Sequence, residues 1–135
     1  MALQLSVSVR NARLDAIETT IGVSAKLQIY SGSMPASCAT APSGTKLLED
    51  VLAADWAANA ASGSKSFNGT PITGVGIAAG TAGYFRVVDT TGTTCHIQGT
   101  ITATGGGGDM TIDNTSIAVG QVVNVTSFTL TDANA

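Results

Sequence analysis

The most reactive side chains of this chain are concentrated in one short segment, GYFRVVDTTGTTCHIQGT (residues 83–100). The segment holds the only histidine, His96, directly after Cys95, and it holds Arg86, the last Lys or Arg of the chain. A cysteine and a histidine can act together as a nucleophile and its general base. That chemistry requires the two side chains to reach each other.

The residues around the pair have the pattern of a β-hairpin. Two β-rich runs flank a short turn in which Gly92 can adopt a positive φ. Neighbouring residues of a strand project to opposite faces. Cys95 is therefore predicted to lie with Ile97 on an apolar face, and His96 with Gln98 on a polar face, so that the two cannot form a dyad with each other.

The sequence contains only weak indications of other catalytic or metal sites. A dyad between Cys38 and His96 stays open, but the sequence signals neither a third orienting group nor an oxyanion site. One histidine and two distant cysteines do not make a zinc spacing. Asp109 and Asp113 could contribute to a calcium site, but both are expected to be solvated. The sequence therefore predicts no catalytic residues, no metal and no cofactor, and it predicts that the protein is not an enzyme.

The N-terminal segment LQLSVSV (residues 3–9) alternates apolar and polar residues. Leu3, Leu5, Val7 and Val9 would lie on one side of a strand. Such a segment is predicted either to be an extended arm that adds to an edge strand of another protein, or to be the first strand of its own domain.

A short helix is predicted over RNARLDAIETTIG (residues 10–22). Apolar residues recur there at spacings of three and four, Asn11 can cap the start and Gly22 can end the helix. Its apolar stripe is narrow, so the helix is expected to lie over the end of a sheet.

The remainder of the chain reads as short strands separated by turns. Strands are expected in SAKLQIYS (24–31), KLLEDVL (46–52), the hairpin, DMTID (109–113) and QVVNVTSFTLT (121–131). Residues 32–45 are expected to be a loop and residues 69–83 a loop with room for one thin strand, while the Ala-rich segment 53–66 is ambiguous. In the first strand Ala25, Leu27 and Ile29 should point inward, and Lys26, Gln28 and Tyr30 outward. The predicted fold is all-β, a jelly-roll-like β-sandwich with one short N-terminal helix. Residues 1–22 form the arm and helix, and residues 23–135 a single β-sandwich domain.

Composition narrows the choice of partners. Only 11% of the 135 residues are charged, against roughly 25% in an average soluble domain, and the formal net charge is −3. A surface so poor in charge favours a homo-oligomer. The six basic residues are scattered, which argues against direct nucleic-acid binding, and no apolar run is long enough for a membrane span. No secretion signal is visible, so Cys38 and Cys95 are expected to start as thiols, and whether they later pair stays open.

Several segments resemble one family of virion proteins. They are RNARLDAIETTIG, LQIYSGSMPASCA, TAGYFRVVD, TTCHIQGT and MTIDNTSIAVGQVVNVTSFTLT, which together cover most of the chain except about residues 45–80. In these segments the chain resembles the head-decoration, or cement, proteins of tailed bacteriophages. The resemblance implies a jelly-roll-like sandwich that forms a dimer or trimer. It further implies synthesis in the host cytoplasm and binding to the major capsid protein on the outer capsid surface.

Capsid cement is the predicted function, and a tail or fibre component that could bind the host is the alternative; a small enzyme is the third class considered, and the residues above argue against it. A cement protein adds its binding free energy to the assembled shell and needs no turnover. The residues predicted to contact partners are the apolar side of the N-terminal segment and one face of the hairpin: Leu3, Leu5, Val7, Val9, Tyr84, Arg86 and His96.

Overall fold

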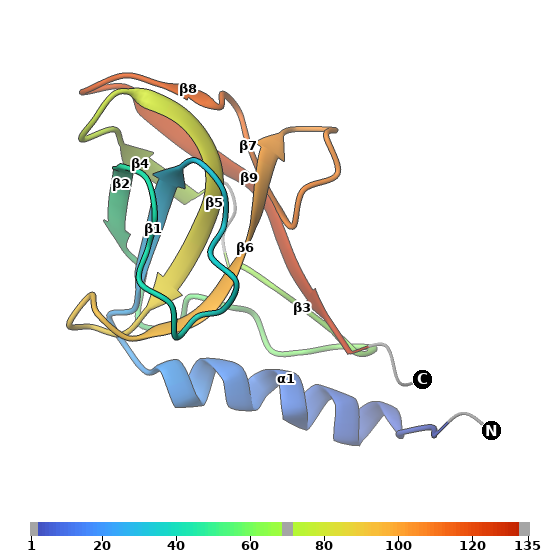
Figure 1. Ribbon diagram of the computed structural model, residues 1–135. Coiled ribbons are helices and arrows are strands. Elements are labelled where there is room, and N and C mark those ends of the chain that lie inside the picture. Colours follow the sequence, from blue (N-terminus) through green and yellow to red (C-terminus); the bar gives the residue numbers. More distant parts are fainter. Residues whose placement is uncertain (1–2, 69–71, 133–135) are drawn as a thin grey trace.

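The computed structural model describes residues 3–68 and 72–132 (Figure 1). One helix, α1 (Val7–Ile21), precedes a sheet with the strand order β2-β1-β5-β6-β7-β9-β3, in which β4 also pairs with β9 and β8 with β5. The strands are β1 (Lys26–Ser31), β2 (Lys46–Val51), β3 (Ser64–Ser66), β4 (Ile72–Val75), β5 (Gly80–Val88), β6 (Cys95–Ala103), β7 (Met110–Ile112), β8 (Ser116–Ile117) and β9 (Val122–Thr131). The prediction of a mostly β fold with one N-terminal helix is confirmed.

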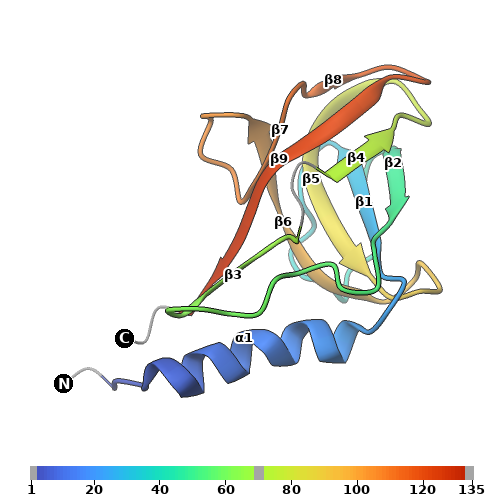
Figure 2. The ribbon, with the colours of Figure 1, turned by 180° about the vertical axis from the view of Figure 1, so that it is seen from behind.

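The sheet curls on itself into a half-barrel (Figures 1 and 2). β4 pairs with β9, the last strand but one in that order. Gly76, directly after β4, forms a bridge with Leu48 of β2, the first strand in the order. The N–H of Ile77 donates to the carbonyl of Leu47 beside that bridge. Opposite parts of the same sheet therefore face each other across one core.

Aromatic rings run through that core. The Phe67 ring lies 5.9 Å from the Trp56 ring and 4.8 Å from the Phe128 ring, and Phe85 contacts Phe128 at 5.2 Å. The Trp56 side chain is buried, with an exposure of 1%. Edge-to-face and tilted ring pairs of this kind add to the free energy gained from burying their area.

The helix begins earlier than the sequence suggested. Ser6 has extended backbone angles and its hydroxyl accepts the N–H of Val9, so Ser6 is the N-cap and not Asn11. The strand or arm predicted for residues 3–9 is therefore wrong from Val7 onward. Gly22 does end the helix, at φ 85°. As expected, α1 lies across one end of the half-barrel (Figure 1).

Polar residues of α1 hold the helix to the chain segment before and within β3. Asn11, Asp15 and Glu18, spaced four and three apart, lie along one side of the helix. Their side-chain oxygens accept the backbone N–H groups of residues 63, 60 and 57, at 2.9, 2.8 and 3.3 Å. The segment 53–66, ambiguous in sequence, is thus a mostly irregular stretch that ends in β3 and is satisfied by the helix.

The glycine run 105–108 makes a tight return between β6 and β7. The two strands run parallel, with Ile101 opposite Met110, although parallel neighbours ordinarily need a connection of a dozen or more residues. Gly105 and Gly107 have φ of 87° and 81°, a backbone region that glycine reaches without steric cost. Strands at 110–112 and 122–131 are confirmed. Residues 69–71 of the predicted loop 69–83 lie outside the described residues; the remainder forms β4, a connection at 76–79 and the start of β5.

Candidate functional site

The predicted N-terminal contact residues lie at the start of α1. Leu3, Val7 and Val9 have exposures of 73%, 49% and 46%, while Leu5 is half-buried. Burying such side chains against a partner would be favourable, because each removes apolar area from water. We call Leu3 and Val7 the N-terminal patch, and leave Val9 out because residues two positions apart in a helix point to different sides of it.

A second exposed apolar patch lies at the opposite end of the half-barrel. Val75 of β4 pairs with Val122 of β9, and the N–H of Gly120 donates to the carbonyl of Gly76, so the two segments are neighbours. The exposed side chains there belong to Val75, Ile77, Val119 and Val122, which we call the far-end patch. Composition alone did not reveal it, because Val75 and Ile77 fall in a glycine-rich stretch that reads as a loop.

Tyr84 and Arg86, predicted to face a partner, are buried, with exposures of 0% and 4%. They lie on the outer face of β5, and the 14-residue connection between β1 and β2 covers them. We call this connection (residues 32–45) the roof loop; Figure 1 shows it in cyan and teal, running over β1, β5 and β6. The expected exposure of Tyr84 and Arg86 is therefore wrong, because the chain's own loop occupies that face.

Four side chains of β5 and β6 hold the roof loop. The Tyr84 hydroxyl donates to the carbonyl of Ser43 at 2.6 Å and accepts its N–H at 2.9 Å. The Arg86 guanidinium donates to the Thr40 carbonyl at 2.7 Å, and Gln98 Nε2 donates to the Pro35 carbonyl at 2.8 Å. The fourth contact joins the sulfur atoms of Cys95 and Cys38, 2.7 Å apart.

The roof loop also needs close backbone approach. A Cβ on Gly83 would overlap the carbonyl oxygen of Gly32, so only glycine allows the start of the loop to lie directly on β5. Beneath the loop, the rings of Tyr30 and Tyr84 stack at 5.2 Å with an interplanar angle of 9°. Gln28 and Tyr30, predicted to point outward into solvent, are consequently buried on the roofed side of β1.

A β-bulge reverses the predicted faces of Cys95 and His96. Val87 pairs with Ile97 but Val88 pairs with Cys95, so His96 is an extra residue on β6. Cys95 therefore shares the roofed face with Arg86, and not the core face with Ile97. The conclusion that Cys95 and His96 point to different faces stays valid, but the assignment of the two faces was wrong.

His96 is exposed and points toward the helix. It lines an open hollow of about 240 Å³ together with Arg13, Ile17 and Ile21 of α1. Ala16 and Thr20 of α1 complete its lining. His96 and the Cys38–Cys95 pair lie on opposite faces of β6, so the structure does not support a dyad of Cys38 and His96.

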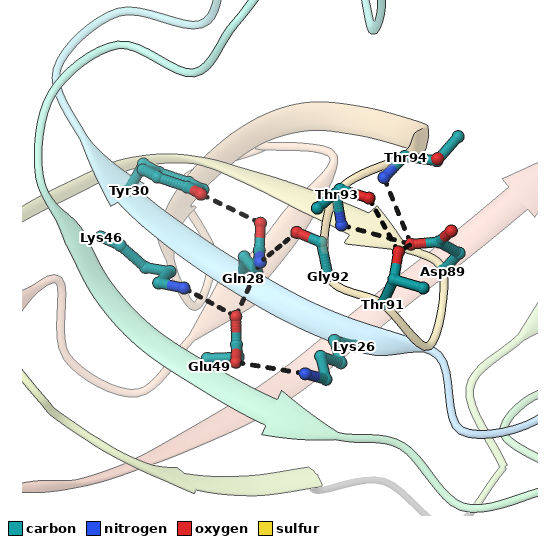
Figure 3. A network of polar contacts seen from close by, with 10 residues as sticks. All are labelled: Lys26, Gln28, Tyr30, Lys46, Glu49, Asp89, Thr91, Gly92, Thr93 and Thr94. Atoms are coloured by element: carbon teal, nitrogen blue, oxygen red, sulfur yellow. Dashed lines mark hydrogen bonds and ion pairs between the residues drawn. The ribbon is translucent and has the colours of Figure 1, made fainter.

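A polar network connects the open edge of the roofed side to the β5–β6 turn (Figure 3). Glu49 accepts Lys46 Nζ and Gln28 Nε2, both at 2.7 Å, and Lys26 Nζ lies 3.7 Å away. The Lys46 hydrogen bond, together with that of Gln28, outweighs burial and lowers the pKa of Glu49. Gln28 Nε2 also donates to the carbonyl of Gly92, so the turn is fixed to β1.

Asp89 organises the turn itself. Its Oδ1 accepts the Thr91 hydroxyl at 2.7 Å and the N–H groups of Thr93 and Thr94 at 3.2 Å (Figure 3). The Thr91 hydroxyl, with the two backbone amides, lowers the pKa of Asp89 to about 2. In both networks the polar groups are hydrogen-bonded to each other, and the bonds hold the turn and strands in place.

Lys65, one of the six scattered basic residues of the sequence, has a role that its position in the sequence did not predict. Its side chain is 1% exposed, and Nζ lies 2.9 Å from both Asp15 Oδ1 and Glu18 Oε2 and 3.0 Å from the carbonyl of Ala58. Burial lowers the pKa of Lys65, but the hydrogen bonds to the two carboxylates outweigh it and the net shift is upward. The residue joins β3 to α1.

Carboxylates elsewhere are used by neighbouring backbone. Asp109 accepts the N–H and hydroxyl of Thr100, and Asp113 accepts the N–H and side-chain amide of Asn124. Within residues 3–68 and 72–132, no group of three or more His, Cys, Asp or Glu side chains is arranged to hold a metal ion. In the same ranges no helix is both long and apolar enough to span a bilayer.

The chain was compared with protein-family models, with curated protein sequences and with solved structures, and none of the three comparisons finds a match.

Proposed function

We propose that this protein is a decoration, or cement, protein that binds the outer surface of a tailed-phage capsid and stabilises it. Its partners would be the major capsid protein and further copies of the same chain, as a dimer or trimer. The observation that carries the proposal is the presence of two exposed apolar patches at opposite ends of one half-barrel.

Two separate patches suit a lattice better than a simple dimer. A twofold dimer buries one patch against its own copy, whereas a chain with two different contact surfaces can join a lattice and a neighbour at once. The low charge of the chain adds little electrostatic repulsion between copies. Many repeated sites on a shell make weak single contacts sufficient for stable attachment.

We assign the capsid contact to the N-terminal patch. Residues 3–5 precede the helix cap and are not paired to any strand of the half-barrel, so their backbone is available to an edge strand of the capsid protein. Leu3 and Val7 then add apolar area to that contact. The arm is shorter than the sequence suggested, because the helix already begins at Val7.

The test is binding to undecorated heads of a phage that encodes the chain. Cryo-electron microscopy of heads mixed with the purified protein should show added density at lattice axes. The double variant Leu3→Asp/Val7→Asp should lose that density, while Ile77→Asp/Val119→Asp, in the far-end patch, should keep it. An acidic residue at position 7 suits the first turn of a helix, so folding should be preserved.

Absence of density with the unmodified protein would overturn the proposal. If the protein instead binds host cells or glycans and not heads, the role is that of a tail or fibre component. If the far-end variant alone loses density, the protein is still a cement protein but the assignment of its contact surface is wrong.

A further inference from the structure

We propose that Cys38 and Cys95 form an intramolecular disulfide site, which covalently fastens the roof loop to β6 when the protein meets a disulfide oxidant. The two sulfur atoms lie 2.7 Å apart, which is about 0.7 Å more than the ~2.03–2.05 Å bond of a disulfide. The inference does not depend on the proposed function, because it concerns contacts within a single chain.

The fold brings the two residues together from 57 positions apart. The bulge at His96 turns Cys95 toward the roofed face; a regular strand would have directed it into the core with Ile97. Cys38 belongs to a turn in which the N–H of Thr40 donates to the carbonyl of Ser37 at 3.1 Å. The position of Cys95 is thus set by the sheet, and that of Cys38 by a local turn.

Arg86 aligns the turn over the strand. Its Nη2 donates to the carbonyls of Thr40 and Ser37, at 2.7 and 3.5 Å, on either side of Cys38. Arg86 is itself on β5, paired with Gln98 of β6, and is 4% exposed. The cross-link therefore requires only a small closing movement between atoms that are already held in place.

Both cysteines are half-buried, so a small oxidant can reach them. With a glutathione-type disulfide, a thiolate of one cysteine attacks the reagent, forms a mixed disulfide and releases one glutathione. The second cysteine then loses its proton and displaces the other glutathione. Two protein thiols are oxidised, one reagent disulfide is reduced to two thiols, and no further electron carrier is needed.

Burial, together with the hydrogen bond and charge of Cys38, raises the pKa of Cys95 to about 12. Cys95 therefore holds its proton at neutral pH, and the first attack is expected from Cys38. A Cys38 sulfur bound in a mixed disulfide carries no charge, so it no longer opposes deprotonation of Cys95. Oxidation should be slow at neutral pH and faster at higher pH.

The experiment uses the folded, reduced chain incubated with excess oxidised glutathione and then alkylated. The oxidised protein should lose both alkylatable thiols and about 2 Da of mass, with no attached glutathione. Trypsin cuts after Lys46 and Arg86, so the cross-link should join peptide 27–46 to peptide 87–135. Its melting temperature should rise on oxidation by several degrees, up to about 15 °C.

Cys38→Ser and Cys95→Ser serve as matched controls that keep the size of each side chain and remove only the link. Neither should show the rise in melting temperature on oxidation. The proposal is overturned if the unmodified protein keeps both free thiols, if each cysteine ends as a glutathione adduct, or if the cross-link forms only between two chains.

Discussion

Replacing Tyr84 by phenylalanine should loosen the roof loop without disturbing the core beneath it. The ring can keep its stacking on Tyr30, while the hydroxyl contacts to Ser43, at 2.6 and 2.9 Å, are lost. A net hydrogen bond in a protein contributes about 1 kcal/mol, which sets a ceiling of about 2 kcal/mol for the pair.

The loss should fall below that ceiling. Ser43 is exposed, so water can satisfy its N–H and carbonyl once the phenol is gone. A local loss of about 1 kcal/mol corresponds to a roughly five-fold rise in the open population of the loop. Arg86, Gln98 and the cysteine pair remain to hold the rest of it.

Two measurements report that population. Hydrogen exchange of the Thr40 amide follows opening within the roof loop, and the alkylation rate of Cys38 under reducing conditions follows exposure of its sulfur. Both rates should rise about five-fold in Tyr84→Phe. Tyr30→Phe is the matched control, because its hydroxyl donates to Gln28 and does not contact the loop.

Equal rates in the two variants would refute the reasoning, since the phenol of Tyr84 would then contribute nothing to loop closure. A large fall in global stability in Tyr84→Phe would refute it in a different way, by showing that the loop and the core unfold together.

Three further predictions concern other parts of the fold. Lys65→Met should lower the free energy of unfolding in urea by roughly 2–4 kcal/mol, because it leaves two carboxylates without their buried cation. Lys46→Met, which removes a more exposed ion pair, should lower it by less than about 1 kcal/mol. Equal losses in the two variants would contradict this prediction. The pKa of Asp89 in the folded protein is lowered to about 2, so its contribution to stability is present above pH ~4 and is lost as the pH falls from ~4 toward 2. NMR titration should show this pKa. In Asp89→Asn the free energy of unfolding should change less with pH across that range. Gly83→Ala should destabilise by about 1–3 kcal/mol in thermal unfolding through the overlap with the Gly32 carbonyl, and an unchanged melting temperature would show that the loop can move aside without cost.

Local patterns predicted the elements whose structure depends on their own residues. The hairpin of β5 and β6, the helix end at Gly22 and the long final strand follow from alternation and from glycine placement. The start of the helix was not predicted, because the alternation in LQLSVSV indicates a strand although Ser6 is also a suitable helix cap. The apolar residues at 3, 5, 7 and 9 gave no sign that the period changes within the segment.

The arrangement of the candidate sites depended on contacts between distant residues. A single inserted residue at His96 exchanges the faces of its neighbours, and nothing in the strand composition marks the bulge. The covering of Tyr84 and Arg86 depends on where residues 32–45 fold back. The length of that loop, well beyond a tight hairpin connection, was the one signal that it needed a surface to pack on.

The buried ion cluster of Lys65 was not predicted because it, too, depends on residues far apart in the sequence. Its two carboxylate partners lie about 50 residues earlier, on the helix, and their spacing along α1 is also that of an ordinary solvated face. Only the docking of α1 against residues 57–65 distinguishes a buried ion cluster from three surface charges.

The described chain starts and finishes at the same end of the molecule (Figure 1). Arg10 and Arg13 of α1 contact the carbonyl and carboxylate of Asp132, the last described residue, at 3.3 and 3.0 Å. The two ends of the described backbone therefore lie close enough for a short linker to join them. A circular permutant joined across this junction and reopened within glycines 105–108 should keep every strand pairing, and would move both chain ends to the exposed turn between β6 and β7.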